Sequence, residues 1–270
     1  LLVLKLSSEK NKPLWAMAAG CVPDALPWEI PIIAHQAGFQ SSGMWLDTIT
    51  TWDNNALSKT KESLKKTEIQ LIDIEVSWLE NDDNLSDNHK LIIDVGLELS
   101  AKNILVVNRH DDYDKALSQF YKMCEYAKEN IRVCLEFGEF TNTKSLDGAV
   151  NFINEINHPV AGILIDLMHI NRSDEKLPDL NNPIYPYIQG CDFYQSSKKL
   201  LGDDYILAAI DDRCCLGKGE ADQDEILKMS LSNLDVSLEI RSKYLRDKFP
   251  NPQERANYIF KNCIREKINN

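Results

Sequence analysis

The sequence alternates between short apolar runs and longer amphipathic segments, and this alternation restricts the fold more than any other feature. Apolar runs rich in aliphatic residues indicate strands that are covered on both faces. They lie at 14–20, 42–47, 69–76, 103–108, 131–137, 162–166, 185–192 and 234–240. Helix-like segments lie between or after them, at 55–67, 87–102, 113–130, 145–157, 222–232 and 251–268.

Strands that interleave with helices, without a linker or low-complexity stretch, indicate a parallel α/β fold. The 270 residues suit an α/β barrel, which commonly uses about 250 residues as one domain. No glycine-rich phosphate-binding motif follows the first strand, which argues against a dinucleotide-binding sheet. We therefore predict a (β/α)8 TIM barrel, formed as a single domain by residues 1–270. The unpatterned stretch 193–220 is interpreted as a functional loop.

Charge and cysteine content limit the partners. The formal net charge of −12 argues against nucleic-acid binding, which needs a basic surface. The negative net charge does not exclude an anionic small substrate, because a local arginine cluster can bind one. Residues 1–10 turn polar too quickly for a secretory signal or a membrane span, so no membrane association is expected. The seven cysteines are an odd number, and Cys134 and Cys191 sit in apolar runs, which favours reduced thiols in a cytoplasmic protein.

Four consecutive predicted strands end in polar side chains. Glu136 ends IRVCLE, and Asp166 closes the aliphatic run of ILIDLMHINRS. Gln189 and Asp192 fall in YIQGCD, and Glu239 follows LDVSL. We expect these groups to converge, because neighbouring strands lie about 5 Å apart and barrel chemistry gathers at the carboxyl ends of the strands. Carboxylates this crowded repel one another unless a cation neutralises them, so the pattern favours a divalent metal site.

Each of these residues also has a simpler interpretation. An acid at a strand end, such as Asp166, is commonly a helix N-cap, and a single His169 is commonly an ordinary polar residue. Glu75, at the end of LIDIE, either lines the same cavity or pairs with a lysine or arginine. Asp192 is a candidate for orienting a ligand. The joint occurrence on four successive strands is what favours the metal site.

A series of motifs extends this pattern over most of the chain. In order they are HQAGFQSSGMWLD, VCLEFGEFTNTKSLDGAVNFINEIN, GILIDLMHINRS, YIQGCDF, RCCLGKGEADQDEILKMS, VSLEI and NPQERAN. With this spacing, the series resembles the xylose-isomerase-like TIM-barrel superfamily, and within it the sugar phosphate isomerase/epimerase-like proteins. The resemblance runs from about residue 35 to the end of the chain.

The resemblance implies roles for individual residues. It implies metal ligands at Glu136, Asp166, Gln189 and Glu239. It also implies substrate contacts from His169 and from Arg213, which precedes the turn formed by Gly217, Lys218 and Gly219. Glu75 and Arg172 complete the candidate substrate-binding residues. Arg213, Arg172 and Lys218 are the cations available for a phosphate or carboxylate.

Gln189 departs from the pattern of many epimerases of this superfamily, which have histidine at this place. Glutamine there is more similar to the dehydratase branch, in particular the dehydroshikimate dehydratases. Binding through the amide oxygen of Gln189 would make all protein ligands oxygens, which suits Mg²⁺ or Mn²⁺ better than Zn²⁺. The expected cofactor is one divalent cation, with Mn²⁺ or Mg²⁺ preferred and Co²⁺ or Zn²⁺ as alternatives.

The chemistry expected of such a site is proton transfer next to a carbonyl. A metal acting as Lewis acid would ease removal of the α-proton and stabilise the enediolate. Glu136 and Glu239 would supply base and acid to its two faces. Returning the proton elsewhere gives an isomerase or epimerase of a sugar, sugar phosphate or keto-polyol. Loss of a β-hydroxyl, with protonated His169 as proton donor, gives the alternative, a dehydratase of the dehydroshikimate or inosose type.

Two other classes of protein are less well supported. Zinc endonucleases for damaged DNA occur in the superfamily, but their sites use many histidines and this chain has only five. A non-catalytic barrel that binds a partner is the other class, and it would carry no metal. The expected partner is therefore a small keto-sugar, sugar phosphate or cyclic polyol, without nucleic acid or membrane, and homo-oligomerisation is left open.

Overall fold

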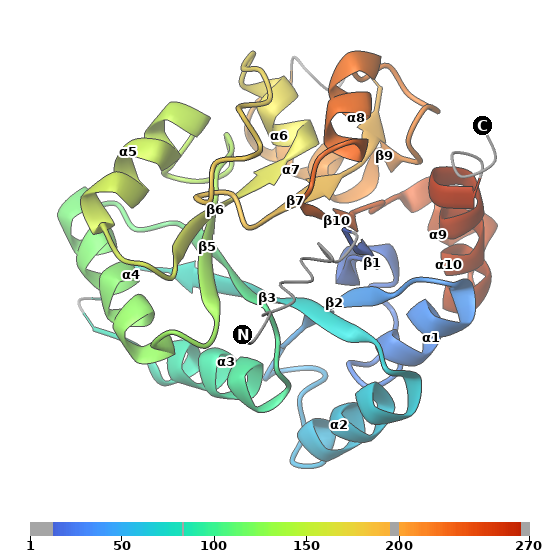
Figure 1. The fold of residues 1–270 in the computed structure, drawn as a ribbon, viewed down its shortest axis with the longest axis horizontal. Coiled ribbons are helices and arrows are strands. Elements are labelled where there is room, and N and C mark those ends of the chain that lie inside the picture. The colour runs from blue at the N-terminus through green and yellow to red at the C-terminus, as the bar shows by residue number, and fades with distance from the viewer. Residues whose placement is uncertain (1–12, 83, 195–199, 266–270) are drawn as a thin grey trace, which may run out of the picture.

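Eight parallel strands close into a barrel within the part of the chain that the computed structural model describes, residues 13–82, 84–194 and 200–265 (Figure 1). Around the barrel they follow the order β1-β10-β7-β6-β5-β4-β3-β2. Their bounds are β1 Trp15–Met17, β2 Ser41–Trp45, β3 Gln70–Leu79, β4 Asn103–Asn108, β5 Arg132–Glu136, β6 Ala161–Asp166, β7 Tyr187–Gly190 and β10 Asp235–Leu238. Each of the eight predicted strands coincides with one of these, and the predicted TIM barrel is confirmed.

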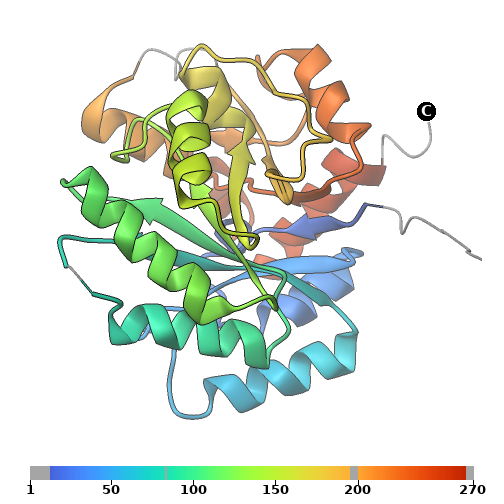
Figure 2. The ribbon, with the colours of Figure 1, turned by 60° about the vertical axis from the view of Figure 1, so that its left-hand side comes forward.

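Helices cover the outside of the barrel, and Figure 2 shows α2, α3 and α4 following one another along one side. The predicted helical segments correspond to α2 Ala56–Thr67, α3 Asp87–Glu98, α4 Tyr113–Ala127, α5 Leu146–Ile156, α8 Gln223–Ser230 and α10 Pro252–Phe260 with a π-helical turn at Lys261–Arg265. The last three residues of the predicted closing helix, 266–268, lie outside the described residues. The sequence pattern missed the shorter α1 Ile30–Ala37, α6 Leu167–Arg172, α7 Gly202–Asp211 and α9 Lys243–Lys248, and the 3-10 turn Ala19–Cys21.

The apolar residues form two layers, which explains why the strands are apolar without interruption. On β5, Val133 and Leu135 belong to the large cluster between strands and helices, whereas Cys134 belongs to a smaller cluster. The same alternation holds on β6, where Leu164 joins the smaller cluster. Because successive side chains of a strand point to opposite faces, the smaller cluster fills the interior of the barrel. Tyr187 of β7 belongs to this inner cluster.

The stretch 193–220, interpreted from the sequence as a functional loop, contains regular secondary structure and contributes to the cavity wall. It contains α7 and the short strand β9 Arg213–Cys214, which pairs with β8 Asp192–Phe193 in a two-stranded antiparallel sheet. Residues 195–199 of this stretch lie outside the described part. In α7 the apolar residues 205–210 form one uninterrupted run, so no alternation of apolar and polar residues with a helical period marked this helix in the sequence.

Asp192 organises the end of this stretch. Its carboxylate accepts hydrogen bonds from the backbone N–H groups of Gly217, Gly219 and Ala221, at 2.9–3.0 Å. A Cβ at Gly219 would lie 2.4 Å from Asp192 Oδ1, so this close approach requires glycine. Asp192 thus shapes the loop that follows Arg213, whereas the sequence had suggested that it orients a ligand.

The described part of the chain contains no helix that is both long and apolar enough to cross a membrane. Residues 1–10, on which the expectation about a signal or membrane span rested, lie outside the described residues. The seven cysteines all lie within the described residues and form no disulfide, as expected.

Candidate active site

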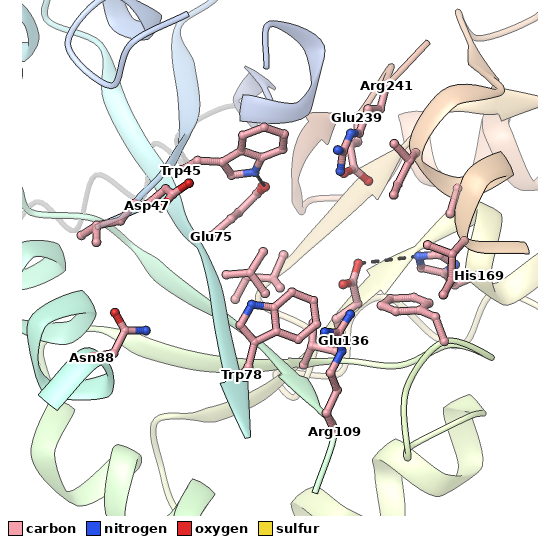
Figure 3. Close-up of a pocket in the computed structure, with 18 of the residues that line it drawn as sticks. Trp45, Asp47, Glu75, Trp78, Asn88, Arg109, Glu136, His169, Glu239 and Arg241 are labelled. Atoms are coloured by element: carbon pink, nitrogen blue, oxygen red, sulfur yellow. Dashed lines mark hydrogen bonds and ion pairs between the residues drawn. The ribbon is translucent and has the colours of Figure 1, made fainter. Parts of the chain in front are cut away.

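A cavity of about 690 Å³ opens at the carboxyl ends of the strands (Figure 3). This volume lies within the range of small-molecule sites. One part of its wall is acidic and carries Glu75, Glu136 and Glu239. The remainder is mostly apolar or aromatic and includes Trp45 and Trp78. The apolar residues come from β2 and the loop after it, β3, β4, the loop after β5, and α7; they are Trp45, Leu46, Ile49, Val76, Trp78, Leu105, Val107, Phe140, Ile206, Ala209 and Ile210.

Glu136, Asp166 and His169 form a compact buried group. Each offers one ligand atom, and these atoms all lie within 4.8 Å of one another. His169 Nε2 is 3.8 Å from Glu136 Oε1 and 4.0 Å from Asp166 Oδ2. Asp166 is also the N-cap of α6, where its Oδ1 accepts hydrogen bonds from the backbone of Met168 and His169. Asp166 is therefore both a helix N-cap and a member of the site, because capping uses only Oδ1 and leaves Oδ2 available for the site.

Arg213 joins two of the acidic groups. Its Nη1 lies 2.7 Å from Asp166 Oδ2 and 3.0 Å from Glu239 Oε2, and Nε donates a hydrogen bond to Ala209 O at 2.8 Å. The side chain is almost fully buried. Burial opposes the charge of Arg213, but Asp166 and Glu239 outweigh it and raise the pKa of the guanidinium well above its usual value. Arg213 is therefore a permanent internal cation of the site.

Gln189 and Glu75 lie beside this group. In the pairing of β6 with β7, Gln189 is opposite Asp166. Its Nε2 donates a hydrogen bond to Glu75 Oε1 at 3.3 Å, and Trp45 Nε1 donates to Glu75 Oε2 at 2.6 Å. Glu75 thus lines the cavity, as one of its two interpretations expected, and is held by an amide and an indole. An irregularity in the pairing of β3 with β4 puts Glu75 and Val76 on the same wall, which a regular strand would not allow.

Burial and mutual repulsion disfavour ionisation of the site's glutamates. Burial is the largest cause in each case. It raises the pKa of Glu75 and of Glu239 to about 8. The pKa of Glu136 also rises well above its usual value, with further contributions from the charges of Glu239 and Asp166. For Asp166, burial is outweighed by Arg213 and His169, and its pKa falls below the usual range. The site therefore combines one firmly ionised carboxylate with three that hold protons readily.

His169 is fixed by α7, which the sequence pattern missed. Its Nδ1 lies 2.9 Å from the hydroxyl of Tyr205, and burial lowers the pKa of the imidazole to about 4. Arg172, also expected near the substrate, packs against Tyr205 instead. Its guanidinium carbon lies 4.5 Å from the Tyr205 ring centre, and Nη1 donates to Tyr205 O at 3.3 Å. Arg172 and Lys218 are not among the residues that line the cavity.

The donor atoms present fit a divalent cation. Gln189 Oε1 is buried and receives no hydrogen bond from any described residue. A buried acceptor without a donor is costly, and a cation would satisfy this oxygen. Glu239 Oε2 is buried as well and has Arg213 Nη1 as its ion-pair partner at 3.0 Å. Glu136 and Asp166 add carboxylate oxygens, and His169 offers a nitrogen in the same group. Such an ion would share Asp166 and Glu239 with Arg213.

Two arginines and two tryptophans of the cavity wall were not identified from the sequence. Arg241 lies with its guanidinium carbon 4.9 Å from the ring centre of Trp45, and Arg109 lies 3.7 Å from that of Trp78. Both arginines closely follow strand ends, Arg109 directly after β4 and Arg241 two residues after Glu239. A systematic search of strand ends for cations as well as for acids would have found them.

The fold and this site together define the class of protein, a (β/α)8 barrel with a largely apolar cavity that has one acidic wall, at the carboxyl ends of its strands. The family profile described as xylose isomerase-like TIM barrel matches residues 32–256. The chain belongs to this family. A comparison with curated protein sequences gives no match.

Solved structures with the same fold include an epimerase, a probable dehydratase and a zinc-bound protein. The IOLI protein, crystallised with a bound zinc atom, superposes with a TM-score of 0.74 at 14% identity, over 92% of this chain and 96% of that one. The probable 3-DHS dehydratase AsbF from Bacillus anthracis gives 0.68 at 15%, over 92% and 97%. D-Allulose 3-epimerase from Methylomonas sp., in complex with D-allulose, gives 0.63 at 14%, over 93% and 96%. This chain also matches 42% of the length of a xylose isomerase-like TIM barrel/4-hydroxyphenylpyruvate dioxygenase fusion protein. At these identities the similarity shows a shared fold.

Proposed function

We propose that this protein is a divalent-metal-dependent isomerase or epimerase of a small sugar, sugar phosphate or keto-polyol. The observation that carries the proposal is the placement of Glu136 and Glu239. They leave the carboxyl ends of β5 and β10, which are separated in the barrel by β6 and β7, and both face one cavity (Figure 3). Two carboxyl groups that approach one cavity from different strands can serve the two faces of a substrate placed between them. The epimerase of the same fold, solved in complex with D-allulose, supports the choice of substrate class, and the zinc-bound IOLI protein supports the choice of a divalent metal.

In this proposal Glu136 and Glu239 exchange the α-proton of the substrate. One carboxylate removes the proton from the carbon next to the carbonyl, and the other carboxyl group returns a proton to the opposite face or to the neighbouring carbon. Arg213 holds Glu239 in place and donates its remaining N–H groups to substrate oxygens. His169, fixed by Tyr205, presents Nε2 to the substrate as a hydrogen-bonding group. The apolar wall excludes water from these groups.

Glu136, Asp166, Gln189 and Glu239 would hold the cation. When bound, it would act as a Lewis acid that polarises the substrate carbonyl. Oxygen donors from all four residues favour Mn²⁺ or Mg²⁺ over Zn²⁺. Because His169 lies within the same buried group, a nitrogen donor for Zn²⁺ or Co²⁺ is also at hand.

A dehydratase is the second candidate function, and Gln189 favours it. The amide at this strand end is similar to the dehydroshikimate dehydratase branch, and the probable 3-DHS dehydratase shares the fold. Elimination needs an acid for the leaving hydroxyl. His169 was the candidate, but burial lowers the pKa of its imidazole to about 4, which makes it a poor proton donor at neutral pH. We therefore place isomerisation or epimerisation first.

The proposal is tested by solvent-deuterium exchange followed by NMR, with Mn²⁺ present, over keto-sugars, their phosphates, inososes and dehydroshikimate. We expect deuterium to enter the carbon next to the carbonyl of one compound, together with formation of its isomer or epimer. Formation of an unsaturated product with loss of water would instead establish the dehydratase. Absence of exchange and of elimination with every compound, in protein that binds no cation, would contradict both.

The roles of His169 and Arg213 can be separated from those of the proposed ligands. We predict that His169→Ala and Arg213→Ala each lower kcat/KM by about 10²–10³-fold, the usual effect of losing a preorganised polar group. Metal content should stay near one ion per chain by elemental analysis. Lys66→Ala, an exposed change on α2, is the control for loss of a positive charge. Loss of the metal together with the activity would show that these two residues belong to the metal site.

A further inference from the structure

We propose that Arg241 forms an anion-binding subsite, so that the substrate carries a phosphate or carboxylate group in addition to its reacting carbonyl. This inference rests on the proposed function for the reacting end of the substrate, and it narrows the substrate class from neutral sugars and polyols to anionic ones. The argument comes from the guanidinium of Arg241, which lines the cavity beside Glu239 (Figure 3).

Apart from its contact with the Trp45 ring, Arg241 has no partner among the described residues. Its guanidinium makes no hydrogen bond and no ion pair with any of them, and its Nε is buried without an acceptor. The side chain is half-buried, and a buried donor without an acceptor costs free energy. In a chain with a net charge of −12, an arginine left without a carboxylate partner in a cavity wall is unusual.

The other cationic side chains near the cavity differ from Arg241 in position or in pairing. Arg213 pairs with Asp166 and Glu239. Arg172 also has buried nitrogens without a described hydrogen-bond partner, but it packs against Tyr205 and does not line the cavity. Arg109 also lines the cavity and has no carboxylate partner, but its side chain is exposed and water can satisfy it. Arg241 is therefore the cation of the cavity wall whose unmet hydrogen bonding points to a ligand.

The position of Arg241 suits an anion close to the reacting groups. One face of its guanidinium covers Trp45, and stacking leaves the N–H groups in the plane of the guanidinium available. These groups match the paired oxygens of a carboxylate or phosphate. An added Cβ at Gly20 would lie 3.4 Å from both Arg241 Cδ and Glu239 Oε1, so the two side chains lie next to each other. A substrate whose anion binds Arg241 would thus place its adjoining carbons near Glu239.

Two further residues, Trp45 and Asp47, lie on the side of the cavity where the anionic group of the substrate would bind. Trp45 fixes Glu75 through its indole N–H while its ring supports Arg241, so the same side chain contacts the acidic wall and the proposed subsite. Asp47, the other acid on this side, already accepts hydrogen bonds from the backbone of Ile49 and the hydroxyl of Thr50. Its carboxylate is therefore held within its own loop.

The test is calorimetric titration of inorganic phosphate and of acetate into the wild-type protein and into Arg241→Gln. We expect at least one anion to bind wild type with a millimolar Kd, and Arg241→Gln to weaken it at least tenfold, as for loss of a charge-assisted hydrogen bond. Preference for phosphate would indicate a phosphate ester as substrate, and preference for acetate a carboxylic acid. Lys66→Gln, which removes one exposed positive charge from α2, should leave the Kd within about twofold.

Three results would overturn the proposal. They are no binding of either anion to wild type, unchanged binding in Arg241→Gln, and loss of binding in Arg109→Gln with retention in Arg241→Gln. Should Arg241→Gln fail to fold, wild-type protein still decides the matter, since the bound anion should protect Arg241 from phenylglyoxal, as read by peptide mass spectrometry. Reaction at an equal rate with and without anion would then count against the subsite.

The test of anion binding at Arg241 and the test of the proposed reaction can fail independently of each other. The titration needs neither turnover nor a substrate, so a protein that binds phosphate at Arg241 but exchanges no deuterium would keep the subsite and lose the proposed reaction. A protein that exchanges deuterium with a neutral ketose as fast as with its phosphate ester, and binds neither anion, would keep the reaction and lose the subsite.

Discussion

At the scale of single residues, each charged group of the cavity is defined by what surrounds it. Asp166 stays ionised because Arg213 contacts it, whereas Glu136 lacks such a direct partner and its pKa rises. Glu75 is held only by an amide and an indole N–H, and its pKa rises to about 8. Similar side chains at neighbouring strand ends thus acquire different protonation behaviour from burial and pairing alone.

Gln189 is the residue at which metal preference can be tested. An amide oxygen is a neutral, hard donor, and imidazole binds Zn²⁺ and Co²⁺ better. We predict that Gln189→His strengthens Zn²⁺ binding relative to Mg²⁺ by at least about tenfold, a typical effect of changing one ligand or its support. The measurement is a competition titration of the two ions, with Gln36→His on the exposed side of α1 as the matched control. An unchanged ratio would mean that Gln189 is not a ligand.

At the scale of elements, the strands could be predicted from the sequence and several contributors to the site could not. Glu136 and Asp166 end uninterrupted apolar runs, so local pattern and the geometry of parallel strands sufficed to place them together. Tyr205 reaches His169 only because α7 folds back over the mouth, and no local signal specifies that contact. The stacking of Arg241 on Trp45 likewise depends on closure of the barrel between β10 and β2 through β1.

Strand β3 carries a second buried acid, Asp73, deeper than Glu75. Its side chain is fully buried, and neither oxygen makes a hydrogen bond to a described residue. A Cβ at Gly43 of β2 would lie 2.4 Å from Asp73 Oδ1, so the neighbouring strand accommodates the carboxyl group only through glycine. Burial raises the pKa of Asp73 from 3.8 to about 7.

This shift makes stability depend on pH. Between about pH 4 and pH 7 folded Asp73 holds a proton that the unfolded chain has lost, so its contribution to stability falls as the pH rises through this window. Asparagine cannot ionise, so a protein with asparagine at this position does not lose stability there as the pH rises. We predict that Asp73→Asn raises Tm relative to wild type at pH 8 by several degrees, and that the difference shrinks towards pH 5. Calorimetric melts at both pH values measure it, with the exposed Asp204→Asn as control. Equal differences at both pH values would exclude ionisation of Asp73 as the cause.

At the scale of the whole molecule, the barrel concentrates negative charge at one end of a chain that is already acidic. Glu75, Glu136 and Glu239 line the cavity at the mouth, and Asp166 lies fully buried beside them. Arg213 is the internal cation that contacts Asp166 and Glu239. Folding must therefore overcome repulsion that the unfolded chain does not feel. A ligand that binds only the folded arrangement, such as a divalent cation, stabilises the whole barrel through that one site.

Removal of metal should consequently lower global stability. At a concentration of Mn²⁺ about 100 times its Kd, binding contributes about 2.7 kcal/mol, which corresponds to roughly 5–10 °C in Tm for a domain of this size. We predict that protein treated with EDTA melts lower by this amount and recovers when Mn²⁺ is added in excess. Asp166→Asn should lose most of the recovery, because the site then lacks the carboxylate that stays ionised. Glu129→Gln, an exposed change after α4 with the same change in net charge, should keep it. Recovery with NaCl at matched ionic strength, or full recovery in Asp166→Asn, would show that Mn²⁺ acts by general screening of the acidic surface and not at the mouth of the barrel.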